Sequence, residues 1–292
     1  MTFIPSTGAN FGNQQFINVN YSTKLVTKFY AESVCGSIFN THWQQTLVEK
    51  GQSVVIRERP TVTVTPTGRN FKTNWTPIND TSQTLTIDYA FEGAVTIDSI
   101  DMHQFDINVQ PEIFDEISNQ LRMNLEVVTL GSIYSQAGTQ IAYSKFTTWN
   151  TSGSPQKYVT EAHALLDMAS APQENRWLLL HPRMLPALKL EQFAFALNAG
   201  TAQGALQRGF VFELDGFKIY VSKFVPGTGL AAAPYQALAG HFEAVTLATQ
   251  FTDFQILPFL ESQRGIGIRC TNGFGFKALK PDCLISLPSV LS

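Results

Sequence analysis

One glycine-rich segment, Gly227-Thr-Gly-Leu-Ala-Ala232, has the G-x-G-x-x-A spacing of a dinucleotide-binding turn. Such a site needs a helix that starts at this turn and an acidic residue about 20 positions later. Pro234 interrupts any helix early, and Glu243 comes too soon, in a stretch with strand character. The segment is therefore better explained as a loop than as a cofactor site.

The densest group of carboxylates lies in a 29-residue stretch with a single arginine, Arg122, among them. Its members are Asp98, Asp101, Asp106, Glu112, Asp115, Glu116 and Glu126. A two-metal nuclease needs carboxylates that converge on one point. Here Glu112, Asp115 and Glu116 share one flank of a predicted helix, which favours a solvated helix face.

The histidines and cysteines show no metal-ligand spacing. The five histidines stand at positions 42, 103, 163, 181 and 241, and the three cysteines at 35, 270 and 283, without a C-x-x-C pair. We expect the cysteines to be buried reduced thiols and His181 to be a core histidine. Nucleophile-elbow, P-loop and H-E-x-x-H motifs are absent. The sequence thus predicts no enzyme, no cofactor and no metal.

Composition limits the partners. Net charge is −3, and the basic residues are scattered, so tight binding to a phosphate backbone is disfavoured. Charged residues make up 15% of the 292 positions, below the usual 25% or so. This is typical of a protein that covers its surface with copies of itself, or of a Thr/Asn-rich β-protein, and composition leaves both open. The sequence has no signal-peptide pattern and no membrane span, so we expect a soluble product of the cytoplasm.

Two segments with period-2 alternation predict a long hairpin arm. They are 53–65 and 83–89, separated by a Thr/Asn/Pro-rich stretch. A two-stranded hairpin is at best marginally stable alone, so its apolar face needs another surface, most simply a neighbouring subunit. The candidate intersubunit contacts are Arg57, Glu58, Arg59, Phe71, Trp75, Glu92 and Asp98. The charged triplet 57–59 would pair across the boundary with Glu92 or Asp98; alternatively these are exposed charges worth less than about 1 kcal/mol.

The clearest helix runs from Pro111 to about Gln136, with proline at its first position and acids in its first turn. It would be a rod of about 38 Å. Residues 1–23 are predicted to be an extended arm or a frayed end, and 24–39 to include a short helix. Further predicted helices span 160–169, 182–185 and 191–198. Predicted strands span 176–181, 210–214, 217–222, 244–248, 254–257, 264–269, 273–279 and 280–287, with a loop at 226–240. The pattern is α+β.

The order of these pieces resembles the major capsid protein of tailed bacteriophages, with the Hong Kong 97-type fold. The resemblance rests on the arm and short helix, the extended loop from Gly51 to Tyr89, and the segment Thr96 to Asp106. It continues with the long helix, with Arg176-Trp-Leu-Leu-Leu-His-Pro182, with the segment from Gly209 to Ser222, and with Gly273-Phe-Gly-Phe-Lys-Ala-Leu-Lys-Pro281. The ordered set, rather than any one motif, carries it.

The resemblance implies six regions. They are an N-arm (1–24), a short helix leading into the peripheral domain (25–44), an extended loop (45–95), a peripheral domain with the spine helix (96–139), an axial domain (140–247), and peripheral strands (248–292). It also implies hexamers and pentamers in an icosahedral head around double-stranded DNA, assembled in the host cytoplasm with a separate scaffolding protein and a portal. The alternatives are an encapsulin-like shell or a soluble α+β enzyme or binding module.

Some members of this family crosslink a lysine to an asparagine with a glutamate as catalyst. Lys72 is a possible donor by its position in the loop alone. Neither the asparagine nor the glutamate can be matched in this sequence, so we predict no crosslinking.

Overall fold

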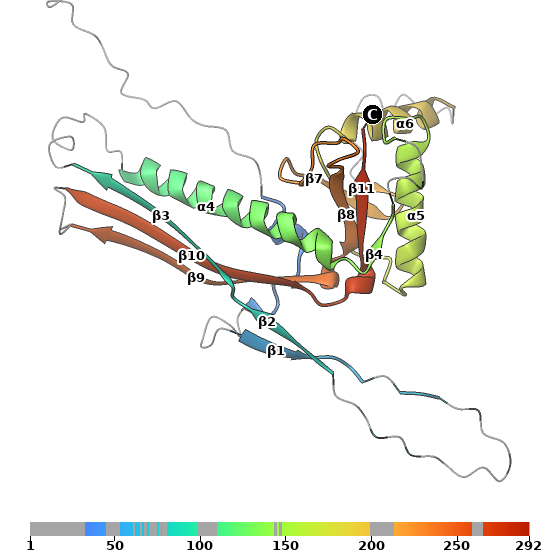
Figure 1. Cartoon of the computed structure of the whole chain (residues 1–292), viewed down its shortest axis with the longest axis horizontal. Helices are drawn as coiled ribbons and strands as arrows, with labels where there is room; N and C mark the ends of the chain where they lie inside the picture. The colour runs from blue at the N-terminus through green and yellow to red at the C-terminus, as the bar shows by residue number, and fades with distance from the viewer. Residues whose placement is uncertain are drawn as a thin grey trace, which may run out of the picture.

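The computed structural model describes residues 33–44, 53–60, 62–64, 66, 69, 75, 77, 81–98, 110–142, 145, 148–198, 213–258 and 265–291. The predicted N-arm, Phe71, Lys72 and residues 99–109 lie outside these ranges. Figure 1 shows a long sheet covered along its length by one helix, and a second sheet with its own helices at one end.

The helices are α1 (Cys35–Ile38), α4 (Gln110–Ile133), α5 (Ser154–Met168) and α6 (Leu185–Asn198). The strands are β1 (Ser53–Arg57), β2 (Ser82–Thr86), β3 (Tyr89–Ile97), β4 (Thr139–Gln140), β5 (Arg176–Leu180), β6 (Glu213–Leu214), β7 (Phe217–Val221), β8 (Tyr235–His241), β9 (Val245–Leu257), β10 (Ile266–Ala278) and β11 (Leu284–Ser289). Short 3₁₀ turns are η2 (Tyr134–Gln136), η3 (Phe242–Ala244) and η4 (Pro281–Cys283). This confirms the α+β class.

The long sheet is antiparallel, in the order β3-β10-β9. The strands β9 and β10 have 13 residues each, where the sequence predicted two short strands in place of each. The polar run Arg269 to Gly273 looked like a break, but every residue in it pairs with both neighbouring strands. A register shift between Gly273 and Phe274 absorbs the irregularity within one continuous strand.

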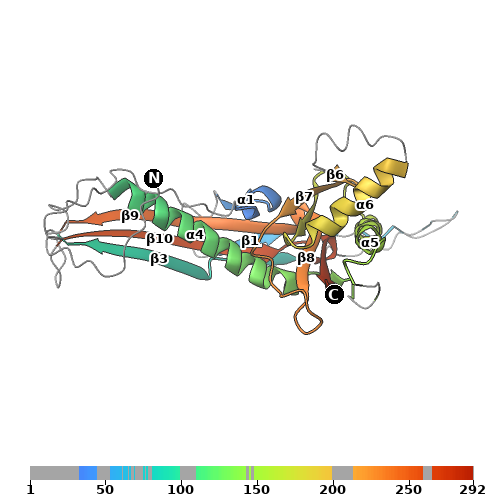
Figure 2. The ribbon, with the colours of Figure 1, turned by 90° about the horizontal axis from the view of Figure 1, so that it is seen from above.

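The spine helix α4 is confirmed, together with its 3₁₀ end at Gln136. It crosses the long sheet obliquely (Figure 2). Its Ile117 and Leu121 are buried against Ile97, Ile268 and Cys270 of the sheet. On the predicted acidic flank, Glu112 and Asp115 are exposed and Glu116 is half-buried, whereas Glu126, further along the helix, is completely buried.

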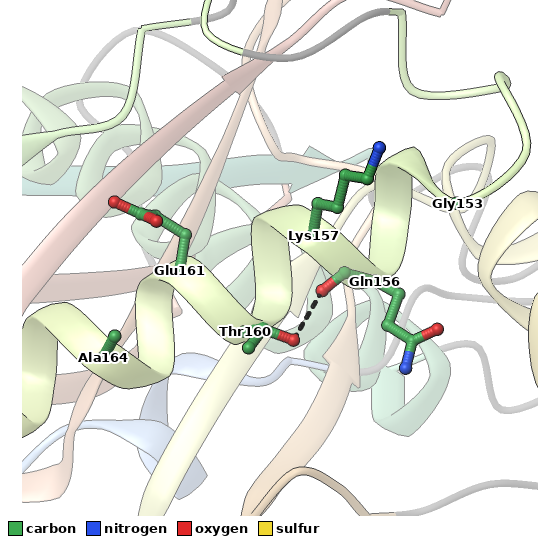
Figure 3. Close-up of a pocket in the computed structure, with 6 residues that line it drawn as sticks. All are labelled: Gly153, Gln156, Lys157, Thr160, Glu161 and Ala164. Atoms are coloured by element: carbon green, nitrogen blue, oxygen red, sulfur yellow. Dashed lines mark hydrogen bonds between the residues drawn. The ribbon is translucent and has the colours of Figure 1, made fainter.

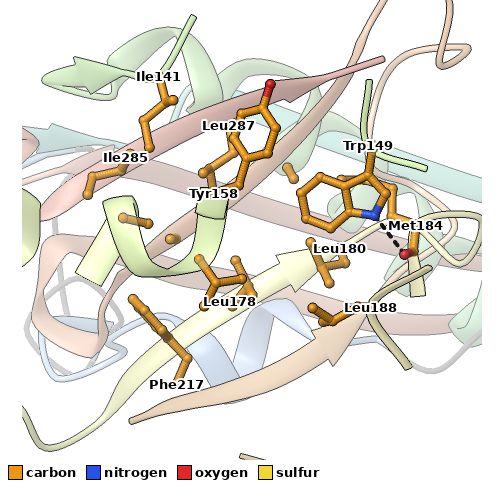
Figure 4. Close-up of a cluster of buried hydrophobic side chains, with 14 of the residues drawn as sticks. Ile141, Trp149, Tyr158, Leu178, Leu180, Met184, Leu188, Phe217, Ile285 and Leu287 are labelled. Atoms are coloured by element: carbon orange, nitrogen blue, oxygen red, sulfur yellow. Dashed lines mark hydrogen bonds between the residues drawn. The ribbon is translucent and has the colours of Figure 1, made fainter. Parts of the chain in front are cut away.

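The second sheet has six strands in the order β4-β11-β8-β5-β7-β6. It is mixed, since β5 pairs with β7 in parallel and with β8 antiparallel. Its core contains Trp149, Tyr158, Leu178, Phe217 and Leu287, among others (Figure 4). The indole N–H of Trp149 donates to the carbonyl oxygen of Met184 at 2.8 Å, which satisfies the buried polar atom.

Three predictions about this region are wrong. The stretch 226–240 is not all loop, because β8 occupies its end as a buried central strand. The helix expected at Thr160 begins at Ser154, after Gly153 in a left-handed conformation. Thr160 lies inside this helix, where its hydroxyl donates to the carbonyl oxygen of Gln156. The strand β11, placed by the resemblance among the peripheral strands, pairs with β8 and β4 instead.

The turn between β6 and β7 matches its prediction. Asp215 has φ of 50° and Gly216 of 75°, so both central residues are left-handed, as a two-residue type I′ hairpin requires. Hydrogen-bonded pairing of Leu214 with Phe217 closes the turn. The Asp-Gly dipeptide was therefore a sufficient local signal.

Where the two sheets meet, α1 is packed between them and α4. Cys35, Ile38 and Phe39 are at most 1% exposed and share one core with Leu130 of α4, Trp177 of β5 and further residues from both sheets. The remaining members of this core include Val245, Leu247, Phe274, Ala278 and Leu284. We call this core the joint.

His241, at the edge of the joint, predicts a pH dependence of stability. Its Nδ1 accepts from the N–H of Glu243 at 3.2 Å. Burial lowers the pKa of His241, which Glu243 opposes and Lys280 reinforces. An unfolded histidine takes up its proton near pH 6.5, earlier than the folded one, so stability falls as pH drops below about 6.5.

We expect His241→Asn, which keeps a side-chain acceptor, to flatten the free energy of unfolding between pH 7.5 and 5.5. Urea denaturation at several pH values measures it. Because burial also lowers the pKa of His181, His181→Asn should flatten the curve further. Parallel curves for the wild type and His241→Asn would contradict the assignment.

Candidate intersubunit surface

The base of the predicted arm is a short hairpin in which β1 pairs antiparallel with β2, from Ser53–Thr86 to Arg57–Ser82. In Figure 1 this hairpin leaves the body below the long sheet. The side chains of Ile56 and Leu85 are buried together with Ala248 of β9, and Trp43, Val54, Ile87 and Leu279 pack around them. The base of the hairpin is therefore covered by distant parts of its own chain, where a neighbouring subunit was the simplest expectation.

Polar contacts hold the same base to the body. The amide of Gln83 donates to the carbonyl oxygen of Leu279, and the ammonium of Lys277 to that of Thr84, each at 2.9 Å. The backbone of β10 approaches the hairpin so closely that a Cβ at Gly275 would lie 1.9 Å from the carbonyl oxygen of Thr86. Only glycine fits at this contact.

Beyond the base, the described apolar residues lie in solvent. Val62 is 71% exposed, Val64 87% and Trp75 88%, and Val55 on the outer face of β1 is 59% exposed. Isolated exposed apolar residues are common on proteins, but several on one projecting segment indicate a contact surface. We call Val62, Val64 and Trp75 the loop anchors.

The charged candidate residues of the hairpin differ in whether they bond to groups of their own chain. Glu58 closes the hairpin within its own chain, since its carboxylate accepts from Thr81 at 3.3 Å and also from the amide of Gln83. Arg57 and Arg59 are exposed, and within the described residues no acid forms an ion pair with either. These two guanidinium groups remain available for a partner.

The two candidate acids lie at and just after strand β3. The carboxylate of Glu92 is 3.5 Å from Nε of Arg269 on β10, in a pair that is about half exposed on both sides. Such a pair contributes little to stability. Asp98 follows the end of β3 and is exposed. Contact of these acids with Arg57 or Arg59 of another subunit stays a prediction, and Phe71 lies outside the described residues.

Three partly exposed apolar side chains, which the sequence did not single out, lie on the two outer strands of the long sheet, on either side of α4. Val95 and Ile256 are the cross-strand neighbours of Ile268 on either side, and Phe254 is the neighbour of Cys270. The helix α4 buries the central strand, while Val95, Phe254 and Ile256 stay 40–50% exposed at its flanks. We call these three residues the sheet strip. The alternation Phe254-Gln-Ile256 was the available signal.

A shallow, open surface groove runs along the first turns of α5, with a volume of about 520 Å³ (Figure 3). It is lined by Gly153, Gln156, Lys157, Thr160, Glu161 and Ala164. Its polar groups serve the helix: Glu161 pairs with Lys145, and Thr160 bonds within α5. The backbone N–H groups of Gly153 and Gln156 already donate to Glu191 of α6, which occupies the positive end of the helix.

Metal and membrane sites can be stated only for the described part of the chain. There, no three His, Cys, Asp or Glu side chains gather in a way that could hold a metal ion. Of the helices in the same residues, none has the length and apolar character to span a bilayer. Cys35 and Cys270 are buried, Cys283 is half-buried, and all three are free thiols.

The fold has clear relatives among solved structures. One from Mycobacterium phage Che8 is 20% identical, covers 93% of this chain and 97% of its own, and has a TM-score of 0.76. The capsid structure of cyanophage P-SCSP1u is 16% identical over 95% and 94%, also at 0.76. The head structure of Helicobacter pylori bacteriophage KHP40 is 13% identical over the full length of both chains, at 0.66.

No protein-family model and no curated protein matches the sequence. At these low identities the solved structures show the fold alone. The chain has the α+β fold of phage capsid subunits, which confirms the resemblance drawn from the order of its sequence elements.

A matched pair of substitutions separates the base of the hairpin from its anchors. Ile56→Ala leaves a cavity against Leu85 and Ala248, at a cost of about 2 kcal/mol. We expect hydrogen exchange of the β1 and β2 amides to accelerate about 30-fold in the unassembled subunit. Val64→Ala should leave the same rates unchanged, because Val64 has no packing to lose. Equal exchange rates in the two variants would contradict the conclusion that the base is packed against the body and the loop anchors are not.

Proposed function

We propose that the chain is the major capsid protein of a tailed phage, with a fold of the Hong Kong 97 type. In this function, hexamers and pentamers of the subunit form an icosahedral head that encloses double-stranded DNA. The observation that carries the proposal is the likeness to capsid and head structures over more than 90% of both chains. Whole-chain coverage supports a shared task more strongly than a shared domain would.

The surface of the subunit agrees with this function. The loop anchors lie at 71–88% exposure on a segment that projects from the body, which is costly for a monomer. A neighbouring subunit that covers them removes the cost, and gives each subunit a strap across the next one. The sheet strip offers a second apolar area for contact between subunits.

The division into regions follows from the same proposal. The loop 45–95 is the strap, 96–139 with 248–283 the peripheral region, and 140–247 with β11 the axial region. Residues 1–24 form the N-arm, and 25–44 lead into the joint. A separate scaffolding protein and a portal are the expected partners. With a net charge of −3, the subunit holds its DNA without tight specific binding.

The first experiment is negative-stain electron microscopy of the expressed protein, with and without its scaffolding protein. We expect closed shells or hexamers and pentamers. A subunit that remains monomeric at every salt concentration, with scaffold present, would overturn the proposal.

The strap is tested by the triple substitution Val62→Ser, Val64→Ser and Trp75→Ser. We expect the yield of shells to fall at least tenfold, because the apolar area that the neighbour covers is lost. The thermal midpoint of the subunit should not change, since these side chains have no packing within it. Thr63→Ser, between the two valines, is the matched control and should assemble normally. Normal assembly of the triple variant, or of a deletion of residues 60–84, would show that the loop is not an intersubunit element.

A further inference from the structure

Glu126, in the middle of α4, is completely buried. Its exposure is 0%, and its carboxylate accepts two hydrogen bonds. The backbone N–H of Val34 donates at 3.2 Å, and the hydroxyl of Ser222 at 2.5 Å. Among the described residues, no Lys, Arg or His forms an ion pair with it. Both donors are neutral.

The two donors belong to different parts of the molecule. Val34 immediately precedes α1, which is packed in the joint, and Ser222 directly follows the strand β7 of the six-stranded sheet. The other end of the α1 segment is tied to β9: Asn40 donates to Val245, and Leu247 donates to Asn40, each at 2.9 Å. Glu126 therefore holds the end of α1 that β9 does not hold.

Burial of the Glu126 carboxylate carries an unfavourable free energy of desolvation. Removing a carboxylate from water without a cation costs free energy that two hydrogen bonds offset only in part. One turn further along α4, the hydroxyl of Thr129 is also buried, and no protein group bonds to it. An apolar side chain at position 126 would pack without this cost. The carboxylate differs from such a side chain in one respect: water stabilises it strongly once α1 moves away.

We propose that Glu126 is a latch, which fastens the start of α1 and the end of β7 to the spine helix and can release them. While the latch is closed, Val34 at the start of α1 is fixed to α4 and to Ser222. When it opens, the start of α1 separates from α4, while the other end remains tethered at Asn40. The latch is a property of the single subunit, so its test is independent of shell assembly.

Cys35 provides a natural reporter, because it is the first residue of α1 and its thiol is fully buried. The probe is Ellman's reagent on the full-length unassembled subunit, with the modified cysteine assigned by peptide mass spectrometry. We expect Glu126→Ala and Ser222→Ala to accelerate the modification of Cys35 at least tenfold. Cys270, buried in the separate core beneath α4, is the internal reference and should change less than threefold.

Glu126→Gln is the matched control. Its amide oxygen can accept from Val34, and its amide nitrogen can donate to Ser222, so the latch stays closed without the charge. Burial, and then Glu126, raise the pKa of the Cys35 thiol, so loss of the charge alone increases thiolate reactivity somewhat. The glutamine variant measures that contribution, which we expect to stay within threefold.

Three results would overturn the latch. Cys35 could react no faster in the alanine variants, Cys35 and Cys270 could accelerate together, which indicates general unfolding, or glutamine could match alanine, which indicates charge alone. If Glu126→Ala does not fold, Ser222→Ala decides the question, because it removes one donor and leaves a smaller gap in the packing.

Discussion

The packing of α1 in the joint is the interaction on which the rest of the structure depends. A four-residue helix is far too short to be stable by itself, so its conformation comes from burial. It contributes Cys35, Ile38 and Phe39 to a core that also takes residues from α4 and from both sheets. These side chains fill the space where α4 meets residues of both sheets, among them Trp177 of β5 and Phe274 of β10. The joint thus determines how an elongated sheet and a compact sheet behave as one body.

The hairpin also depends on burial for its stability, but only its base is buried. A two-stranded unit is marginal in water, and this one is stabilised where Ile56 and Leu85 reach the body. Past Glu58 the described residues have no such cover, as the exposure of Val64 and Trp75 shows. One continuous segment therefore serves its own subunit at one end and presents apolar groups to solvent at the other. In the proposed shell, a neighbouring subunit covers the apolar residues that the subunit's own body leaves exposed.

Local signals in the sequence were enough for elements that obey local rules. Pro111 and the apolar stripe predicted α4, and Asp215-Gly216 predicted the β6–β7 turn. Elements set by tertiary pairing were missed. The strand β8 reads as Ala/Gly-rich, with Ala237, Ala239 and Gly240 all buried, and a Cβ at Gly240 would lie 3.1 Å from the ring of Trp177. Only its pairing with β5 and β11 in the structure identifies it as a central strand.

In the candidate site, too, local features could be predicted from the sequence and distant contacts could not. The exposed loop could be inferred from alternation without a partner, but the cover of its base could not, since Ala248 and Leu279 lie about 190 residues away. Glu126 looked like its neighbours Glu112 and Asp115 on the helix. Only the donors Val34 and Ser222, 92 and 96 positions away in sequence, distinguish it. No pattern within a helix reports such distant contacts.

The low charge of the chain fits the distribution of its surface groups. Ion pairs such as Lys280–Glu243 and Arg269–Glu92 lie in solvent, where each contributes little, while the loop anchors and the sheet strip are apolar. In the proposed shell, we expect burial of apolar area to supply most of the driving force for assembly. Apolar burial is not screened by salt and strengthens on warming from low temperature, whereas exposed charge pairs weaken as salt rises. A shell built in this way keeps its strength when the ionic conditions around it change.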